Sequence, residues 1–207
     1  DELLQAQLTY QADAVVGPLH PLYPPGTPAW VIKGGFFAPP AIATGTRHHT
    51  GATNNCLINA TLLRRTATPF DLRFAMTGGE DANFFMRLHQ EGYKIVWCHE
   101  AKVYEEVPAS RASANWICQR GRRCWASHSM IEKELKPGLP TRAVRALKGV
   151  ALIGIGGMMW PLARIRGEAA RVSSRLSVAR GLGTLDGLRG TMEEEYKVIH
   201  TPRGVVQ

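Results

Sequence analysis

The sequence predicts an α/β fold, and three observations support this prediction. A helical pattern over residues 1–11 is followed by a short apolar segment at residues 12–16 that is typical of a buried strand. A second helical pattern around residues 80–91 precedes strand-like segments at 93–97 and 101–104. With 207 residues, of which 44% are hydrophobic, the chain can bury one ordinary core with an appendage, or two small domains.

The first elements follow from local patterns. Residues 1–11 form a helix with an apolar side, and the strand at 12–16 ends at Gly17-Pro18. Residues 20–40 hold six prolines, which predicts a long loop that either borders a site or is disordered. Residues 51–58 predict a turn that enters a short strand.

The central helix is the clearest element. Phe84, Phe85 and Leu88 recur at helical spacing, and Gly92 is a suitable residue just beyond the helix C-terminus. Residues 93–97 and 101–104 then predict two strands or one bent strand, and the chain becomes helical and cationic after Arg111.

The positive charge belongs to the second half of the chain. The net charge is +8, but the first 110 residues hold 8 of the 25 Lys and Arg and 10 of the 17 Asp and Glu. The isoelectric point of about 9.6 alone would suggest nucleic acid, yet no stacking or zinc motif supports that partner. We therefore expect no nucleic acid partner.

The helical second half holds an apolar segment and a basic one. Residues 149–163 carry no charge but are fewer than the ~20 needed to span a bilayer. If residues 164–176 continue as one helix, an apolar stripe and a mainly cationic one would run along it, which is typical of a helix on an anionic membrane surface. A solvated basic face packed on the domain is the alternative. The cationic stripe would be Arg164, Glu168, Arg171 and Arg175, beside Ile165, Ala169, Val172 and Leu176.

The cysteine spacing favours neither a disulfide framework nor a structural zinc site, which indicates a reducing compartment. The four cysteines are Cys56, Cys98, Cys118 and Cys124. The sequence begins without Met and shows no signal peptide pattern, so we expect it to be a fragment of a longer protein.

Two adjacent carboxylates, Glu80 and Asp81, follow Gly78-Gly79 at the start of the central helix. Glycines at this place let the backbone approach a ligand closely, and the first helical turn offers free N–H groups that offset the repulsion between the two charges. The alternative is the ordinary preference of acidic residues for a first helical turn.

Three blocks of sequence resemble, in order, the second half of a family 2 glycosyltransferase domain of the GT-A type (Rossmann-like, binding nucleotide-diphospho-sugars). They are GATNNCLINATLLRR, FDLRFAMTGGEDANFFMRLHQEGYKIVWCHEAKVYEEVPASR and WICQRGRRCW, at residues 51–65, 70–111 and 116–125. The similarity is greatest to bacterial exopolysaccharide glucosyltransferases of the succinoglycan type. G-G-E-D followed by F-x-x-R-L-x-x-x-G is the most specific part.

The resemblance implies an inverting sugar transfer from a nucleotide-diphospho-sugar to a saccharide or lipid-linked acceptor in polysaccharide synthesis. Asp81 matches the aspartate that acts as general base in such families, and Glu80 would hold the acceptor or tune Asp81. A base must lie within hydrogen-bond reach of the acceptor hydroxyl. A glycosidase is disfavoured, because its two acids flank the bond from different elements whereas these two are adjacent.

Six further residues match positions of the family motifs, and each has a simpler reading. Thr53, Asn54 and Asn55 match a T-G-N-type segment that lines the donor sugar site, although Asn54 stands where glycine is common; a polar turn is the alternative. Glu105 matches a V-x-E position, or is an exposed acid.

Arg120 and Arg123 fit an R-x-x-R spacing on a helical turn, which suits a departing diphosphate, or a basic face toward lipid phosphates. The aromatic residues Trp97, Trp116 and Trp125 could stack on sugars, although core packing is the commoner use.

The family's D-x-D motif, which holds Mg²⁺ or Mn²⁺ against the diphosphate, is absent from this sequence. We therefore expect an amino-terminally truncated domain that lacks metal ligands. Residues 1–130 would be the acceptor-side half of a GT-A domain, and 131–207 a basic helical extension.

The expected location is cytoplasmic, peripheral to the inner face of the bacterial plasma membrane. A non-catalytic membrane-surface binding module derived from such an enzyme is the alternative function.

Overall fold

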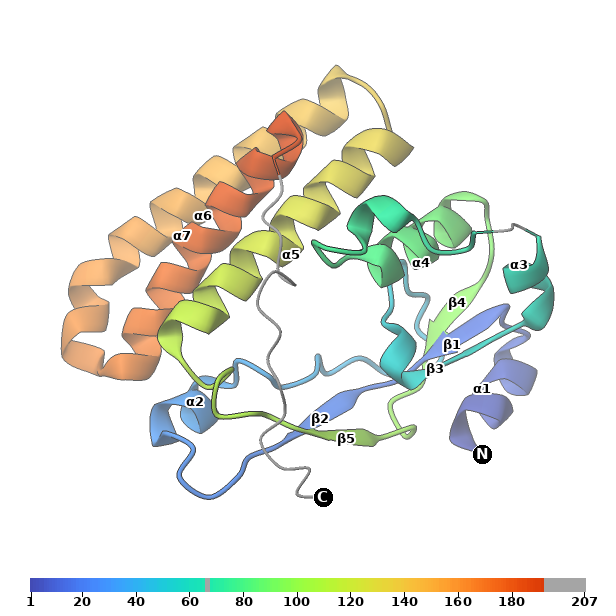
Figure 1. Ribbon diagram of the computed structural model, residues 1–207, viewed down its shortest axis with the longest axis horizontal. Coiled ribbons are helices and arrows are strands. Elements are labelled where there is room, and N and C mark those ends of the chain that lie inside the picture. Colours follow the sequence, from blue (N-terminus) through green and yellow to red (C-terminus); the bar gives the residue numbers. More distant parts are fainter. Residues whose placement is uncertain (66–67, 192–207) are drawn as a thin grey trace, which may run out of the picture.

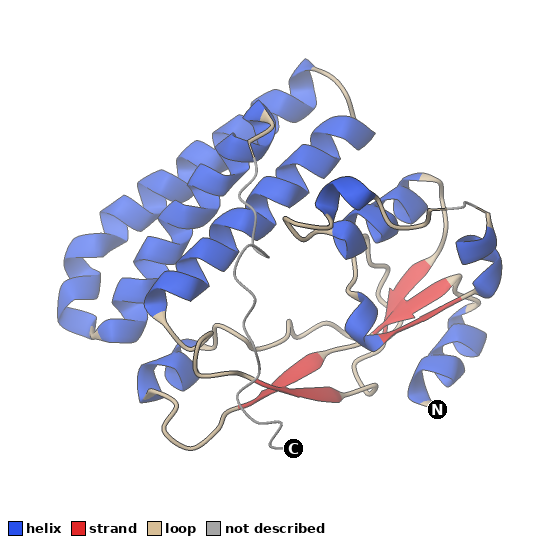
Figure 2. Ribbon diagram, viewed as in Figure 1, coloured by secondary structure: helices blue, strands red, loops and turns tan. Residues whose placement is uncertain are grey.

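The computed structural model describes residues 1–65 and 68–191. The fold is mixed α/β, with short strands gathered on one side of the molecule and three long helices on the other (Figure 2). The elements, in order, are α1 (Glu2–Tyr10), β1 (Ala14–Val16), β2 (Leu19–Leu22), α2 (Ala29–Gly34), η1 (Thr53–Asn55), β3 (Cys56–Ile58), α3 (Ala60–Arg64), η2 (Leu72–Phe74), α4 (Glu80–Gln90), β4 (Ile95–Trp97), β5 (Val103–Glu106), α5 (Ala114–Leu135), α6 (Leu139–Arg166) and α7 (Glu168–Arg189).

The first sheet has the strand order β3-β1-β4, with β1 parallel to β4 and antiparallel to β3. Alternate residues of β1 face opposite sides, as the period of a strand requires. Val16 packs with Phe84 and Phe85 of α4, whereas Val15 packs with Ala6 of α1. Helices α4 and α1 therefore cover opposite faces, and the predicted helix–strand order is confirmed here.

Helix α4 ends as its sequence predicts. Gly92 has φ +93°, and the residue after it, Tyr93, donates its backbone N–H to the Leu88 carbonyl at 3.0 Å. A left-handed glycine at this place allows the chain to leave the helix and enter β4.

The second sheet is a two-stranded parallel ribbon of β2 and β5, in which His20 lies opposite Tyr104. The prediction of one long loop over residues 20–40 is wrong in part, because this stretch holds the end of β2 and the short helix α2. The expectation that it borders a cavity is confirmed, since residues 20, 21 and 36–40 line one. The two segments at 93–97 and 101–104 are separate strands, and β4 and β5 belong to different sheets. Figure 1 shows the ribbon running from the first sheet toward α2 and the start of α5.

The three long helices form one layer in which α7 lies between α5 and α6 (Figure 1). Glycines permit the close approach. A Cβ on Gly181 of α7 would lie 2.5 Å from the Gly149 carbonyl oxygen, and one on Gly183 would lie 2.0 Å from that of Arg122. Ser174 donates its hydroxyl to the Gly156 carbonyl at 2.6 Å. Gly149 and Gly156 of the apolar segment thus serve helix packing, whereas a Cβ on Gly154 or Gly157 would meet no atom within 4 Å.

The single amphipathic helix expected across residues 164–176 is wrong. Gly167, with φ +95°, separates α6 from α7, and the two helices run side by side. Val172 and Leu176 are buried against Ile117 of α5 instead of facing outward. The proposed stripes therefore do not lie on one helix.

Helix α6 has 28 residues, and its most apolar 18-residue window has a mean hydropathy of 1.4 with 17% of that window buried. By length and composition it is the one helix of the described residues that could cross a membrane. The domain boundary expected between residues 130 and 131 falls inside α5, and residues 192–207 of the expected extension lie outside the described part of the chain.

Candidate active site

Helix α4 begins at Glu80, directly after two glycines in the left-handed region, Gly78 (φ +73°) and Gly79 (φ +108°). A Cβ on Gly79 would lie 2.8 Å from the Cβ of Ser127 on α5. The Ser127 hydroxyl in turn donates to the Gly78 carbonyl at 3.1 Å. Close packing against α5 therefore requires glycine at position 79, while Gly78 and Gly79 also line the cavity described below.

Asp81 is held in place by one residue of the segment that leads into β3. The backbone N–H and the hydroxyl of Thr53 donate to its two carboxylate oxygens at 3.1 and 2.9 Å. A carboxylate has about four acceptor positions, so these two bonds leave positions for a substrate hydroxyl. The pair fixes the orientation of Asp81 without neutralising its charge.

Glu80 lies beside Asp81 in the first turn of α4. Its Oε2 is buried and accepts no hydrogen bond from the described residues. An unpaired buried carboxylate oxygen is costly, and a hydroxyl donor from a bound molecule would remove that cost.

Both carboxylates line a cavity of about 560 Å³, which we call the carboxylate chamber. Its walls come from the start of α4, from η1 and β5, and from α5 and α6. Seven charged side chains line it, four of them guanidinium groups: Glu80, Asp81, Glu105, Arg111, Arg120, Arg123 and Arg145. A base and a set of cations thus surround one space, which suits chemistry in which negative charge develops.

Glu105 of β5 and Arg111 form an ion pair at 3.3 Å. The guanidinium groups of Arg111 and Arg120 each lie 5.6 Å from the centre of the Trp116 ring, and the Phe37 ring stacks on the same ring at 5.9 Å. Glu105 is therefore partly exposed and paired with Arg111. The Trp116 ring packs against the guanidinium groups of Arg111 and Arg120.

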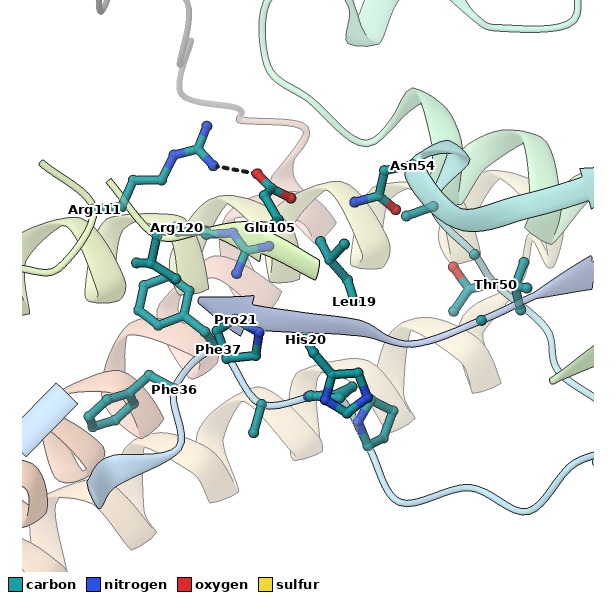
Figure 3. A pocket seen from close by; sticks show the side chains of 18 of the residues that line it. Leu19, His20, Pro21, Phe36, Phe37, Thr50, Asn54, Glu105, Arg111 and Arg120 are labelled. Carbon is teal, nitrogen blue, oxygen red and sulfur yellow. Dashed lines mark hydrogen bonds and ion pairs between the residues drawn. The ribbon is translucent and has the colours of Figure 1, made fainter. Parts of the chain in front are cut away.

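A second cavity of about 400 Å³ borders the carboxylate chamber at the Glu105–Arg111 pair, and we call it the aromatic chamber. Figure 3 shows side chains that line it. Figure 3 shows the pair beside strand β2, with Phe36 and Phe37 on one side and Thr50 and Asn54 on the other. The two chambers share eight lining residues, namely Leu19, Gly51, Ala52, Asn54, Glu105, Arg111, Trp116 and Arg120. The two chambers are therefore adjacent, and we refer to them together as the cleft.

The predicted T-G-N-type residues have three different environments. Asn54 lines both chambers, and Thr53 orients Asp81. Asn55 is 6% exposed, and its amide donates to the carbonyls of Pro18 and Ala101 at 2.9 and 2.7 Å. Asn55 thus ties together the segments that follow β1 and β4, and it lines neither chamber.

The remaining predicted residues, Arg120 and Arg123 of α5, both line the carboxylate chamber. The other two tryptophans differ: Trp97 is 6% exposed in the core and lines the aromatic chamber, whereas Trp125 packs under the Arg180 guanidinium at 4.6 Å.

Sequence reasoning missed His128 and Arg145, which reach the carboxylate chamber from α5 and α6. Arg145 is 8% exposed and pairs with Glu132, which also lies 3.6 Å from the His128 ring nitrogen. Burial, and next the charge of Arg145, lowers the pKa of His128. No local pattern could reveal these residues, because helix packing alone brings them to the cleft. Arg111 could have been predicted as a site residue, since it is the last residue of the second sequence block that resembles the family.

The residues present do not make a site for the divalent cation expected of the family. Across residues 1–65 and 68–191, no group of three or more His, Cys, Asp or Glu side chains could hold a metal ion. The carboxylates of the cleft are instead tied to Thr53 and Arg111, or stand unpaired as Glu80 does.

The chain is similar in sequence to one curated protein of exopolysaccharide synthesis. The chain is 31% identical over 198 residues to the succinoglycan biosynthesis protein ExoM of Rhizobium meliloti (strain 1021). The match covers 94% of this chain and 62% of that protein, so the chain spans less than two thirds of its relative. No family model matches the chain. No solved structure matches it either.

Proposed function

We propose that this chain belongs to an exopolysaccharide glycosyltransferase family and is the acceptor-side part of an inverting, family 2 enzyme of the GT-A type. The similarity to a succinoglycan biosynthesis protein over nearly the whole chain supports the biological role. The single observation that carries the chemistry is Asp81, oriented by Thr53 on the wall of a cavity that arginines also line.

In the proposed reaction an acceptor hydroxyl binds in the carboxylate chamber and gives its proton to a free lone pair of Asp81. The hydroxyl oxygen forms a bond to the anomeric carbon of the donor sugar. The bond from that carbon to the nucleoside diphosphate breaks, and its electron pair leaves with the diphosphate. A general base of this kind contributes typically about 10²- to 10⁴-fold.

Neighbouring residues of the chamber would position the two substrates. The free Oε2 of Glu80 accepts a second acceptor hydroxyl, and Asn54 contacts the donor sugar. Arg120 and Arg123 stabilise the leaving diphosphate, because guanidinium groups pair well with phosphate oxygens.

The donor's nucleotide and Mg²⁺ or Mn²⁺ belong to the full enzyme in this proposal. Because the described residues offer no metal site, no step here depends on a metal ligand of this chain. The D-x-D segment and the nucleotide-binding strand are expected from the part of the enzyme that this sequence does not contain.

The decisive variant is Asp81→Asn in the full enzyme, measured as transfer of labelled sugar to an endogenous acceptor. We expect transfer to fall at least about 10²-fold, with binding of the nucleotide-sugar nearly unchanged. Asn keeps the size of the side chain and can still accept from Thr53, so the fold is retained. Full activity in this variant would end the proposal.

A membrane-surface role, alone or beside the transferase, has its own support in α6. This helix exposes large apolar side chains, among them Leu147, Met158 and Ile165 at 71, 83 and 82%. Basic residues flank them, namely Arg142, Lys148, Arg164 and Arg166. An apolar face rimmed by cations complements an anionic bilayer, and we propose a location on the cytoplasmic side of the plasma membrane.

A further inference from the structure

We propose that the aromatic chamber is a saccharide subsite that holds the sugar next to the reacting one, so that the acceptor is at least a disaccharide. This inference rests on the proposed function. The reacting sugar would occupy the carboxylate chamber at Asp81, and the next one would lie beyond the Glu105–Arg111 pair.

The geometry supports two linked sugars, because the two cavities are adjacent. The Glu105–Arg111 pair, Leu19 of β2 and Asn54 line both, so these side chains form the boundary between the two chambers. In this proposal a chain of sugars that begins at Asp81 passes these side chains and continues along β2 into the aromatic chamber, whose lining Figure 3 shows.

The walls of the aromatic chamber suit a pyranose ring. Seven of the residues that line it are aromatic or proline, namely Pro21, Phe36, Phe37, Pro39, Pro40, Trp97 and Trp116. The C–H faces of a sugar ring pack on such surfaces, while a few fixed polar groups orient the hydroxyls. The polar groups here are His20, His48, Thr50 and Asn54.

Two polar atoms of these walls have no protein partner. Trp97 Nε1 and His20 Nε2 are buried, and neither makes a hydrogen bond within the described part of the chain. The Trp97 side chain as a whole is 6% exposed, so water does not readily satisfy its N–H. A sugar hydroxyl can accept from Trp97 and can pair with His20 in either direction, which meets both requirements.

The charges favour a neutral ligand over a phosphate. Both arginines of the aromatic chamber, Arg111 and Arg120, lie on the wall shared with the carboxylate chamber, whereas Glu106 lines the aromatic chamber alone. Burial, and next the neighbouring His49, lowers the pKa of His48, which removes a further cation at neutral pH. A nucleotide would therefore be repelled from the inner part of this chamber.

The test uses this chain with four probes, namely glucose, the disaccharides cellobiose and maltose, and uridine monophosphate, followed by saturation-transfer NMR. We expect at least one disaccharide to bind about fivefold more tightly than glucose. Trp97→Phe keeps an aromatic ring but removes the N–H, and should weaken disaccharide binding by about two- to tenfold, the worth of one hydrogen bond, with glucose unaffected.

Three controls keep the result interpretable. Trp160→Phe, on α6 outside both chambers, should leave binding of the disaccharide unchanged. If Trp97→Phe does not fold, Phe37→Leu removes a wall ring from a partly exposed loop position and should weaken disaccharide binding in the same way. Binding is measured without any transfer step, so a failure of the proposed chemistry, seen as full activity of Asp81→Asn, is distinguishable from a failure of the subsite.

Three outcomes would overturn the subsite. The first is equal binding of glucose and both disaccharides, or no binding of any sugar. The second is disaccharide binding that is the same in the wild type and in the folded aromatic-chamber variant. The third is competition by uridine monophosphate that depends on Trp97, which would assign the chamber to a nucleotide.

Discussion

Thr53 donates two hydrogen bonds to Asp81, one from its backbone N–H and one from its hydroxyl, at 3.1 and 2.9 Å. The two residues are 28 positions apart and come from the segment before β3 and from the first turn of α4. A single residue thus fixes both oxygens of the proposed base. Since a base must meet its hydroxyl in one orientation, mutation of Thr53 tests directly whether the orientation of Asp81 matters for sugar transfer.

Thr53→Val should lower the rate of sugar transfer by about tenfold, because it removes one hydrogen bond to a charged group but keeps the side-chain shape and the backbone N–H. The Michaelis constant for the donor should change little. Thr53→Ser, which restores the hydroxyl, should recover most of the rate. Steady-state kinetics of both variants measure the effect. Equal transfer rates in Thr53→Val and Thr53→Ser would show that this hydroxyl does not position the base.

Gly79→Ala should destabilise the fold by about 2 kcal/mol or more. Alanine is strained at φ +108°, and its Cβ would meet Ser127 at 2.8 Å. Gly154→Ala is the matched control, since a Cβ there meets no atom within 4 Å and the position is inside α6. Alanine at that site should stabilise by up to about 1 kcal/mol. Urea unfolding would measure both, and a neutral Gly79→Ala would contradict the observed turn.

The stability of the fold should fall as the pH is lowered through about 6.5, the ordinary histidine pKa. Burial lowers the pKa of His48, His89 and His128, which are neutral in the folded protein. The unfolded chain takes up protons near pH 6.5, whereas the folded chain does so only at lower pH, so unfolding is favoured across that window. Thermal unfolding from pH 7.5 to 5.5 measures the slope.

His128→Gln separates one contribution from the rest. Glutamine cannot take up a proton, so the melting temperature of the variant should fall less steeply than that of the wild type over the same pH range. The groups that face His128 are Glu132, Arg145 and His49. An unchanged slope in this variant would show that His128 is not a source of the pH dependence.

The sequence was informative where local pattern decides the structure. Helix α4 could be predicted from the spacing of Phe84, Phe85 and Leu88, and its end from Gly92, which adopts the left-handed conformation just beyond the helix. The acidic pair could be predicted as a site from the resemblance of its sequence block to the glycosyltransferase motif, because acidic residues in a first helical turn are common on their own. The predicted Glu80, Asp81, Asn54, Glu105, Arg120 and Arg123 all line one cavity.

Local pattern failed where tertiary packing decides. Periodicity alone could not reveal the turn at Gly167, because a glycine can stand inside a helix or end it, and the apolar stripe continued across it. Asn55 looks like its neighbours in the sequence, but η1 turns its amide toward two buried carbonyls. Arg145 is distant in sequence from Asp81 and reaches the chamber because the start of α6 packs against the last turns of α5, where Arg145 pairs with Glu132.

Membrane binding should depend on the exposed face of α6 and not on the arginines first suspected. Arg171 is paired with Glu168 at 2.5 Å, and Arg175 donates to Asn115 at 3.2 Å, so both are engaged within the protein. Charge reversal at these two positions should therefore change binding to anionic vesicles only slightly. Met158→Asp combined with Ile165→Asp should reduce it by more than about tenfold, since each burial of such a side chain contributes about 1.5–3 kcal/mol.

The matched control is Leu8→Asp combined with Leu72→Asp, which adds the same charge at apolar positions that are 70 and 76% exposed on α1 and η2. Because all four positions are exposed, neither pair should disturb folding, which circular dichroism can verify. Co-sedimentation with vesicles that contain anionic lipid should distinguish the two double variants, and neutral vesicles should bind less of the parent chain, since the flanking basic residues attract negative headgroups. If both double variants bound as the parent does, the apolar face of α6 would not be the contact surface, whereas equal loss in both would show that added negative charge alone prevents binding.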